Sequence, residues 1–312
     1  MPGVIRRLAP RLLLGLLVAL AATACGLYAP DLPRDALEAR YAAPPSRFLP
    51  VEGLRLHLRD TGPPGAPPVI LLHGFASSLH TWDAWAGLLE ADHRVIRLDL
   101  PGFGLTGADP TGDYSDARAV AVLAATMDAL GVGRADVIGS SMGGRIAWAF
   151  AAARPERVER LVLMAPDGFA GPGREYGVRG RVPLLLCALP YTLPDFLLRR
   201  SLEPAYGRRE ALDEATLART RAMLLAPGVR RAILDRAEGA VLEPPEPILA
   251  RIRAPVLLLW GEADRLIPAA HAADYRRALP GARLVVLPGL GHVPMEEDPA
   301  GALEPVRAFL AR

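Results

Sequence analysis

Hydrophobic residues in this chain form short continuous runs that are separated by longer segments of mixed polarity. A short apolar run is typical of a strand that is buried on both faces. Such runs occupy residues 68–74, 93–100, 135–140, 160–165, 255–261 and 282–288. Helical periodicity runs through the segments 82–90, 115–130, 142–153, 268–279 and 298–311. This alternation predicts an α/β fold with a mostly parallel sheet, helices on both faces and functional loops at the carboxyl ends of the strands.

Two segments depart from simple alternation. Residues 47–51 and 54–60 predict an antiparallel hairpin at one edge of the sheet. The long stretch between the strands at 160–165 and 255–261 has helical periods broken by Pro and Gly. We interpret it as a helical cap inserted above the sheet. The expected domains are therefore a core in two parts, 47–167 and 246–312, with the cap at 168–245 between them.

The N-terminus has the pattern of an export signal. Several arginines precede the apolar run LLLGLLVALAATA at residues 12–24, and small residues lead from that run to Cys25. This order resembles a bacterial lipobox, although Ala22 stands where Leu is more usual. Residues 1–24 would then be a signal peptide, and Cys25 would be the lipidated first residue of the mature protein.

Two other interpretations of this N-terminus remain open. The apolar run extends to Ala29, which is borderline for spanning the ~30 Å of a bilayer core, so an uncleaved membrane anchor is one of them. Ordinary secretion is the other. All three interpretations export the body of a bacterial protein, and the first two attach it to the extracytoplasmic side of a membrane. Residues 25–46, rich in Pro and Ala, would form a tether with a short helix before the body.

Composition narrows the classes of partner. All 36 basic residues are arginines, spread among 34 acidic residues without a clustered stripe, so we expect no nucleic-acid binding. The chain has no metal-ligand cluster, phosphate-binding loop or dinucleotide fingerprint, so we expect no metal and no cofactor. Cys187 lies in the apolar run VPLLLCALP, and we expect it to be a buried small hydrophobe.

The strand at 135–140 is followed by the sequence Gly139-Ser140-Ser141-Met142-Gly143. This is G-x-S-x-G between a buried strand and an apolar helix, the context of a nucleophile elbow. The central serine is Ser141, and glycines on both sides allow the sharp turn. Backbone N–H groups at the start of the helix would favour negative charge that develops near this hydroxyl.

Three more segments at the carboxyl ends of strands carry matching chemistry. The His-Gly pair after the strand at 68–74 leads to Phe75, whose N–H, with that of Met142, would form an oxyanion hole. Asp264 follows the strand at 255–261, and His292 lies in a Gly/Pro-bounded loop after the last strand. A carboxylate there can orient and stabilise an imidazolium.

Other residues compete for these roles. Asp167, after the strand at 160–165, is an alternative acid. His73 is expected to hold its turn by hydrogen bonds rather than to act as a base. The remaining histidines lie in strand or helix patterns, and we expect them to be surface or packing residues.

The order Ser141, Asp264, His292 is that of the α/β-hydrolase triad, and the body from about 47 to 312 resembles this family. The segment DLPGFGLTG at 99–107 resembles the family's loop D-x-P-G-x-G-x-S after the fourth strand. The resemblance implies an enzyme that uses a serine nucleophile. Ser141 argues against the epoxide hydrolases and haloalkane dehalogenases of this fold, which attack with a carboxylate at the elbow.

We therefore expect hydrolysis of a carboxylic ester, with an apolar acyl or alkyl group, through an acyl-enzyme. The apolar cap segment around Cys187 would line the acyl pocket, or it would only pack the cap on the sheet. Carbon–carbon bond hydrolases of vinylogous diketones share the triad, but they usually carry Trp after the histidine, where this chain has Val293. The cap arginines 174, 179 and 181 keep that alternative open, and a non-catalytic ligand-binding surface lipoprotein is a third.

Overall fold

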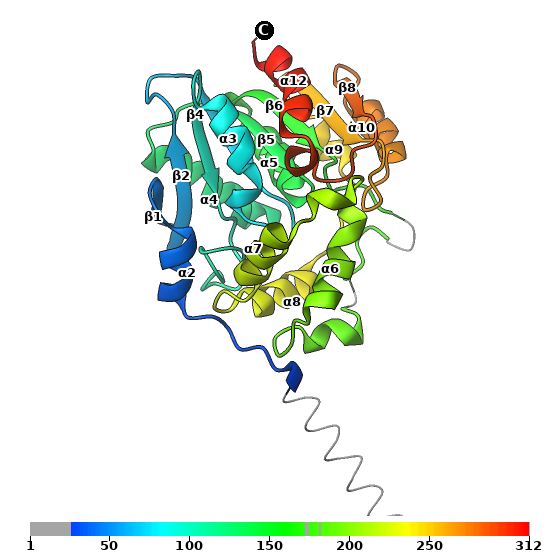
Figure 1. Cartoon of the computed structure of the whole chain (residues 1–312). Helices are drawn as coiled ribbons and strands as arrows, with labels where there is room; N and C mark the ends of the chain where they lie inside the picture. Colours follow the sequence, from blue (N-terminus) through cyan, green and yellow to red (C-terminus); the bar gives the residue numbers. More distant parts are fainter. Residues whose placement is uncertain (1–25, 172–174, 181, 312) are drawn as a thin grey trace, which may run out of the picture.

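A computed structural model describes residues 26–171, 175–180 and 182–311. Its central feature is an eight-stranded sheet in the order β1-β2-β4-β3-β5-β6-β7-β8 (Figure 1). The strands are β1 (Ser46–Val51), β2 (Leu54–Thr61), β3 (Pro68–Leu72), β4 (Arg94–Leu98), β5 (Ala135–Ser140), β6 (Val158–Met164), β7 (Val256–Gly261) and β8 (Arg283–Leu287). All pairs from β4 to β8 are parallel, whereas β1 and β2 form an antiparallel hairpin and β2 pairs antiparallel with β4. The predicted sheet and its antiparallel edge are confirmed.

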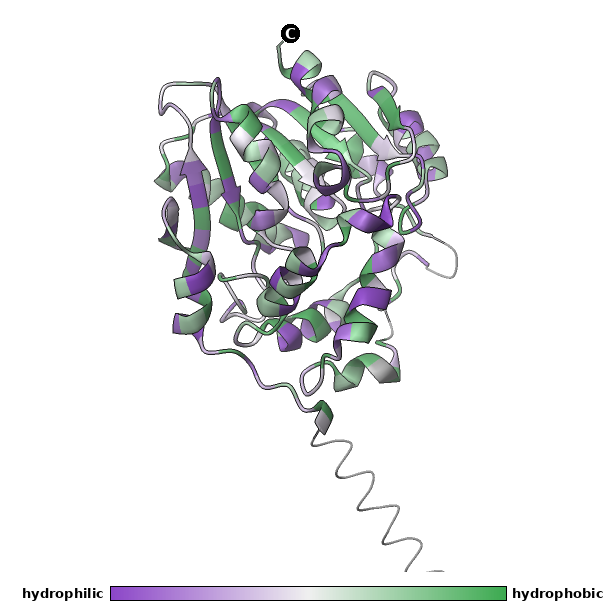
Figure 2. Ribbon diagram, in the orientation of Figure 1, coloured by the Kyte–Doolittle hydropathy of each residue, from purple (hydrophilic) through white to green (hydrophobic). Residues whose placement is uncertain are grey.

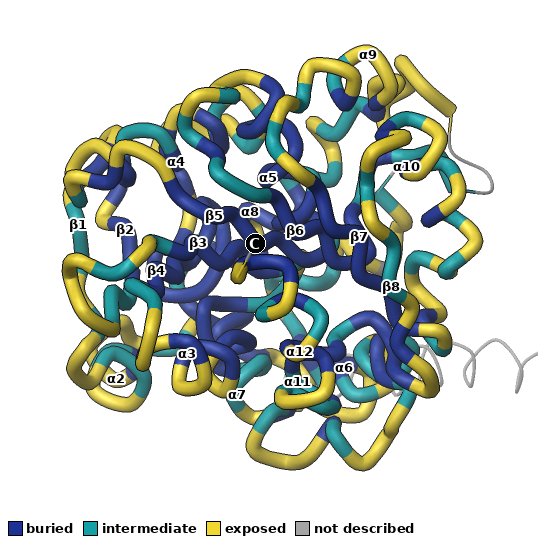
Figure 3. Tube along the Cα trace, turned by 90° about the horizontal axis from the view of Figure 1, so that it is seen from above, coloured by how far each residue is buried: buried dark blue, intermediate teal, exposed yellow. Residues whose placement is uncertain are grey.

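Alternate residues of the central strands supply two separate cores. Val69 and Leu71 of β3 pack on one face, together with residues of α3 and α12. Ile70 and Leu72 pack on the other face, together with residues of α4 and α5. Because side chains alternate across a strand, a continuous apolar run serves both faces at once. Figure 3 shows the inner strands buried and the surrounding helices exposed on their outer sides.

Helices cover both faces of the sheet and fill the long crossover. Outside the cap they are α2 (Arg34–Tyr41), η1 (Leu79–Trp82), α3 (Asp83–Leu89), α4 (Asp116–Ala129), α5 (Met142–Ala153), η2 (Pro155–Arg157), η6 (Ala269–His271), α10 (Ala272–Ala278), α11 (Pro294–Glu297) and α12 (Pro299–Leu310). The crossover from β6 to β7 contains η3 (Leu184–Ala188), α6 (Asp195–Leu202), η4 (Glu203–Ala205), η5 (Arg209–Ala211), α7 (Glu214–Leu224), α8 (Val229–Gly239) and α9 (Glu246–Leu249). Figure 1 shows α6, α7 and α8 grouped as a cap at one end of the sheet.

The apolar segment around Cys187 differs from the prediction. Cys187 is exposed, not buried. Its neighbours Leu184 and Leu186 are exposed as well, while Leu193 and Leu198 of the same segment are buried. The segment therefore covers the outside of the cap, and only a few of its side chains pack inward.

The predicted export signal at 1–24 and the lipidation site Cys25 lie outside the described residues. Within residues 26–311, apart from the few left undescribed, no helix has both the length and the apolar character needed to span a bilayer.

Candidate functional site

The turn between β5 and α5 has the geometry of a nucleophile elbow. Ser141 has φ 54° and ψ −118°, a left-handed conformation that is strained for a residue with a side chain. A Cβ on Gly139 would lie 2.2 Å from the Gly143 carbonyl oxygen, and a Cβ on Gly143 would lie 2.3 Å from that of Leu72. Both positions therefore require glycine, as the G-x-S-x-G motif predicts.

Backbone hydrogen bonds hold Ser141 in this strained conformation. Its N–H donates to the Met164 carbonyl at 2.9 Å, and its carbonyl accepts from the N–H groups of Arg145 and Asp167 at 3.0 Å each. The residue thus starts α5 while it stays tied to the end of the neighbouring strand β6. The preceding Ser140 is almost fully buried, whereas Ser141 lines a cavity under the cap.

His292 and Asp264 form a buried pair at the carboxyl ends of β8 and β7. The Nδ1 of His292 donates to Oδ2 of Asp264 at 2.7 Å. The other carboxylate oxygen, Oδ1, accepts from the N–H groups of Leu266 and Ile267 at 2.8 and 2.9 Å. Both oxygens of Asp264 are therefore occupied, and the imidazole is held in the tautomer that leaves Nε2 free to accept a proton.

Asp167, the alternative acid, makes different contacts. Its backbone carbonyl accepts from Trp148 Nε1 at 3.1 Å and from the Tyr275 hydroxyl at 2.9 Å. Among the described residues, no side-chain hydrogen bond joins its carboxylate to His292. The contacts favour Asp264 as the partner of the imidazole.

The cap fixes the loop that carries His292. The His292 N–H donates to the Ala205 carbonyl at 2.6 Å. The carboxylate of Glu297 accepts from the N–H of Gly291 at 2.8 Å and from the N–H of Arg208 at 2.7 Å, so one side chain ties this loop to the cap. Burial raises the pKa of Glu297. The sequence MEEDP gave no sign of this role, because the contact depends on how the cap returns to the sheet.

The loop after β3 lies against Ser141. A Cβ on Gly74 would stand 3.2 Å from the Cβ of Ser141, and Phe75 and Met142 line the same cavity as Ser141. His73 is fully buried, accepts from the Leu100 N–H through Nε2 at 2.9 Å and bonds the Gly74 carbonyl through Nδ1 at 2.7 Å. Burial lowers the pKa of this histidine. It shapes the turn, as predicted, and both ring nitrogens are in use.

The described side chains include no hydrogen bond between Ser141 Oγ and His292. The structure therefore shows two separate groups. His292 is hydrogen-bonded to Asp264, and Ser141 lines one cavity together with Phe75 and Met142.

The cavity beside Ser141 has a volume of about 1070 Å³ and a charged lining. Arg145 pairs with Asp116 across it at 2.8 Å. The described residues give Arg236 no ion pair; its guanidinium lies 5.7 and 5.8 Å from the ring centres of Phe103 and Tyr114. Burial lowers the pKa of Arg236.

The described residues of the apolar segment 182–198 do not contribute to the lining of this cavity. Of the two interpretations of this segment, packing of the cap fits the structure better, because Leu193 and Leu198 join the core and no described residue of the segment lines the cavity. Of the three cap arginines considered from the sequence, Arg179 lines the cavity, while residues 174 and 181 lie outside the described residues.

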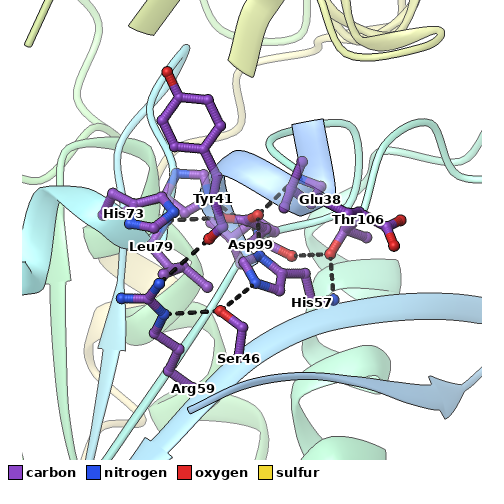
Figure 4. A network of polar contacts seen from close by, with 12 residues as sticks. Glu38, Tyr41, Ser46, His57, Arg59, His73, Leu79, Asp99 and Thr106 are labelled. Atoms are coloured by element: carbon purple, nitrogen blue, oxygen red, sulfur yellow. Dashed lines mark hydrogen bonds and ion pairs between the residues drawn. The ribbon is translucent and has the colours of Figure 1, made fainter. Parts of the chain in front are cut away.

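A second serine–histidine–aspartate contact lies in the core, and the sequence did not reveal it. His57 bonds Asp99 Oδ2 through Nδ1 at 2.7 Å and Ser46 Oγ through Nε2 at 3.0 Å (Figure 4). The side chains of His57 and Asp99 are fully buried. Asp99 also accepts from the N–H groups of Leu79 and Leu105, at 2.7 Å each.

This core network has a structural role. Burial acts to raise the pKa of Asp99, but His57 and the hydrogen bonds outweigh it and lower that pKa to about 2. The carboxylate therefore stays charged and ties β2 to the loops that follow β3 and β4. The imidazole is fully buried, so no substrate can reach it. Through the hydrogen bond from the Leu79 N–H to Asp99, the pair holds the loop that leads from Phe75 to η1.

Comparison with known proteins agrees with the fold. Residues 67–299 match the family model described as alpha/beta hydrolase fold. A 2-hydroxy-6-oxononadienedioate/2-hydroxy-6-oxononatrienedioate hydrolase of Burkholderia vietnamiensis is 33% identical over 266 residues, which cover 77% of this chain and 85% of the relative. A putative 2-succinyl-6-hydroxy-2,4-cyclohexadiene-1-carboxylate synthase of Bacillus subtilis is 32% identical over 268 residues, which cover 80% and 92%.

A solved structure of a membrane phospholipase A, described as a bacterial virulence factor, superimposes with a TM-score of 0.74 at 29% identity and covers 97% of this chain and 98% of that one. The family model spans most of the chain, and the two relatives above are named as enzymes. The chain therefore belongs to the α/β-hydrolase fold family and is a hydrolase of that fold.

Proposed function

We propose that this hydrolase cleaves carboxylic esters through an acyl-enzyme on Ser141. His292 Nε2 accepts the Ser141 hydroxyl proton as Oγ attacks the ester carbonyl, and the N–H groups of Phe75 and Met142 stabilise the oxyanion. The tetrahedral intermediate then expels the alcohol, which takes the proton from His292. Water, deprotonated by the same imidazole, releases the acid and restores the serine.

The observation that carries this proposal is the buried pair of His292 and Asp264. The 2.7 Å hydrogen bond fixes the neutral imidazole with its proton on Nδ1, so that Nε2 is a base. The same carboxylate stabilises the imidazolium that forms once the proton has moved. A serine in a strained turn at the start of α5 supplies the matching nucleophile.

Ester hydrolysis is favoured over carbon–carbon bond cleavage by the residue after the base. Val293 follows His292 and packs against apolar residues of the core and the cap, where the carbon–carbon bond hydrolases usually have Trp. The similarity to a membrane phospholipase A, which extends over nearly the whole chain, points in the same direction. Carbon–carbon bond cleavage remains the second candidate, because a relative of 33% identity carries that activity in its name.

We further propose that residues 1–25 attach the hydrolase to the extracytoplasmic side of a bacterial membrane. The support is the arginine-rich start, the apolar run 12–24 and the cysteine that follows it. Intact mass of the membrane-extracted chain separates the models. Loss of residues 1–24 with acyl chains on Cys25 supports a lipoprotein, and an unmodified full-length mass supports a signal anchor.

The test of the reaction compares two substrate classes with one enzyme preparation. p-Nitrophenyl esters of increasing acyl length are assayed beside a vinylogous diketone acid. The proposal expects ester turnover that Ser141→Ala abolishes and Ser140→Ala largely retains. Efficient cleavage of the diketone with slow turnover of every ester would replace the proposal with the second candidate.

A further inference from the structure

The outer end of the cap carries a set of exposed apolar side chains. We call it the outer cap patch; its members are Leu184, Leu186, Tyr191, Phe196 and Leu197. Leu184 is 88% exposed, Phe196 68% and Tyr191 65%. Exposed hydrophobic residues that lie together are typical of an interaction surface, whereas isolated ones are ordinary. Figure 2 shows hydrophobic residues on this part of the cap, beside the start of the described chain.

The first described residues are fixed directly beside the outer cap patch. The Ala29 N–H donates to the Tyr191 carbonyl at 2.9 Å, and Tyr28 forms an isolated antiparallel bridge with Thr192. Leu27 and Tyr28 are themselves exposed, by 45% and 60%. They extend the same apolar surface.

An ion pair within the cap secures this arrangement. Arg230 of α8 is almost fully buried; it donates to Asp31 at 2.7 Å and to the Leu189 carbonyl at 3.3 Å. Asp31 also accepts from the Gly228 N–H at 3.0 Å. The first described residues are thus part of the cap, and these contacts fix the exit point from which the chain leads back to Cys25.

This exit point limits how far from the cap the membrane can lie. Ala24 precedes Tyr28 by four residues, which span at most about 14 Å of extended chain. Whether the membrane holds the run 12–24 or acyl chains on Cys25, it must therefore lie within this reach of Tyr28, which adjoins the outer cap patch at Thr192.

We propose that the outer cap patch, with Leu27 and Tyr28, rests in the lipid–water interface of the membrane that holds the N-terminus. Tyrosine beside leucine and phenylalanine is the composition that favours this interface. Because the patch is apolar, its contact with zwitterionic lipid needs no anionic headgroup and withstands added salt. The inference rests on the proposed membrane attachment, and it is independent of which bond the enzyme cleaves.

Cys187 provides the probe, because it is exposed on η3 within the patch. The full chain is reconstituted in phosphatidylcholine vesicles, and its thiols are labelled with a bimane fluorophore. Lipids that carry a doxyl quencher near the headgroup are then introduced. The variant Cys187→Ser measures any label on Cys25, which is subtracted. We expect roughly twofold or greater quenching at Cys187 that persists in high salt.

A pair of charge variants tests the patch itself. Leu184→Glu with Phe196→Glu places two carboxylates in the patch. Leu88→Glu with Val286→Glu is the control, since these residues are exposed hydrophobic side chains on α3 and β8, outside the cap. The proposal expects both variants to float with vesicles and to turn over a short soluble ester normally, while only the patch variant loses quenching.

Each other outcome contradicts the inference in a distinguishable way. If the wild type floats without quenching at Cys187, or if both charge variants are quenched equally, the patch does not rest in the interface. The proposed membrane attachment is unaffected by that result. A wild type that does not float overturns the membrane attachment as well, whereas ester turnover reports separately on the proposed reaction. Self-association in detergent that the patch variant abolishes would assign the surface to a second copy of this chain.

Discussion

Replacing Asp264 by asparagine isolates the role of the acid, because the surrounding backbone dictates how the new amide must lie. The N–H groups of Leu266 and Ile267 both donate to Oδ1, at 2.8 and 2.9 Å. The amide oxygen of Asn takes that position, and its NH₂ group then faces Nδ1 of His292. An NH₂ donor requires Nδ1 to accept, so the ring proton moves to Nε2. The imidazole then presents a donor instead of a base.

The opposite orientation of the amide is unfavourable. It would direct the NH₂ group at two backbone donors and leave both unsatisfied, at about 1–3 kcal/mol for each buried group. The wrong tautomer therefore dominates. A change of this kind lowers kcat by roughly 10⁴-fold, which corresponds to about 5.5 kcal/mol of transition-state stabilisation at 1.36 kcal/mol per tenfold. The melting temperature should change little, because the hydrogen bonds of the native site are replaced one for one.

The assay is steady-state hydrolysis of a p-nitrophenyl ester, with thermal melts of the same preparations. Asp167→Asn is the matched control, because only the backbone of Asp167 makes hydrogen bonds among the described residues. We expect this control to retain most of its activity. A large loss in Asp167→Asn together with near-normal turnover in Asp264→Asn would instead identify Asp167, at the end of β6, as the acid.

Three further predictions follow. Ser141→Ala should lower ester turnover by about 10⁴-fold or more, whereas Ser140→Ala should retain most activity; the reverse result would shift the register of the elbow. Gly143→Ala should destabilise the fold by about 1–3 kcal/mol or more in denaturant unfolding, because its Cβ would lie 2.3 Å from the Leu72 carbonyl oxygen; an unchanged midpoint would contradict the packing argument. Burial raises the pKa of Asp136 to about 6, so ionisation of this carboxylate costs stability as the pH rises from about 4 to 6. Asp136→Asn should therefore stabilise the fold above pH 6, by at most roughly 3 kcal/mol, and should have no effect below pH 4. A gain in stability that does not depend on pH would show that ionisation of Asp136 is not its cause.

The sheet and the elbow could be predicted from the sequence because their signals are local. The run ADVIGS is apolar throughout and becomes β5, whose residues are all buried. The glycines beside Ser141 are required by contacts within a few residues of the turn and with the end of the neighbouring strand β3. His292 and Asp264 were predicted because the carboxyl ends of parallel strands share one edge of the sheet.

Features that depend on how the cap returns to the sheet could not be predicted. An apolar run indicates burial, but Cys187 and Leu184 are exposed, because the run lies on the outside of an inserted unit. No pattern in the sequence predicts that Arg236 lines the cavity beside Ser141. His57 lies in an ordinary strand pattern, and its bond to Asp99 joins residues from β2 and the end of β4, which the alternation of polarity does not specify.

Tandem mass spectrometry of the chain labelled with a fluorophosphonate tests the central claim most directly. Trypsin cleaves after arginine and releases ADVIGSSMGGR, residues 135–145, so that fragmentation distinguishes Ser140 from Ser141. We expect one adduct, on Ser141, which Asp264→Asn slows strongly. An adduct on Ser140, an adduct on Ser46 of the core network, or hydrolysis of esters without any adduct would contradict it.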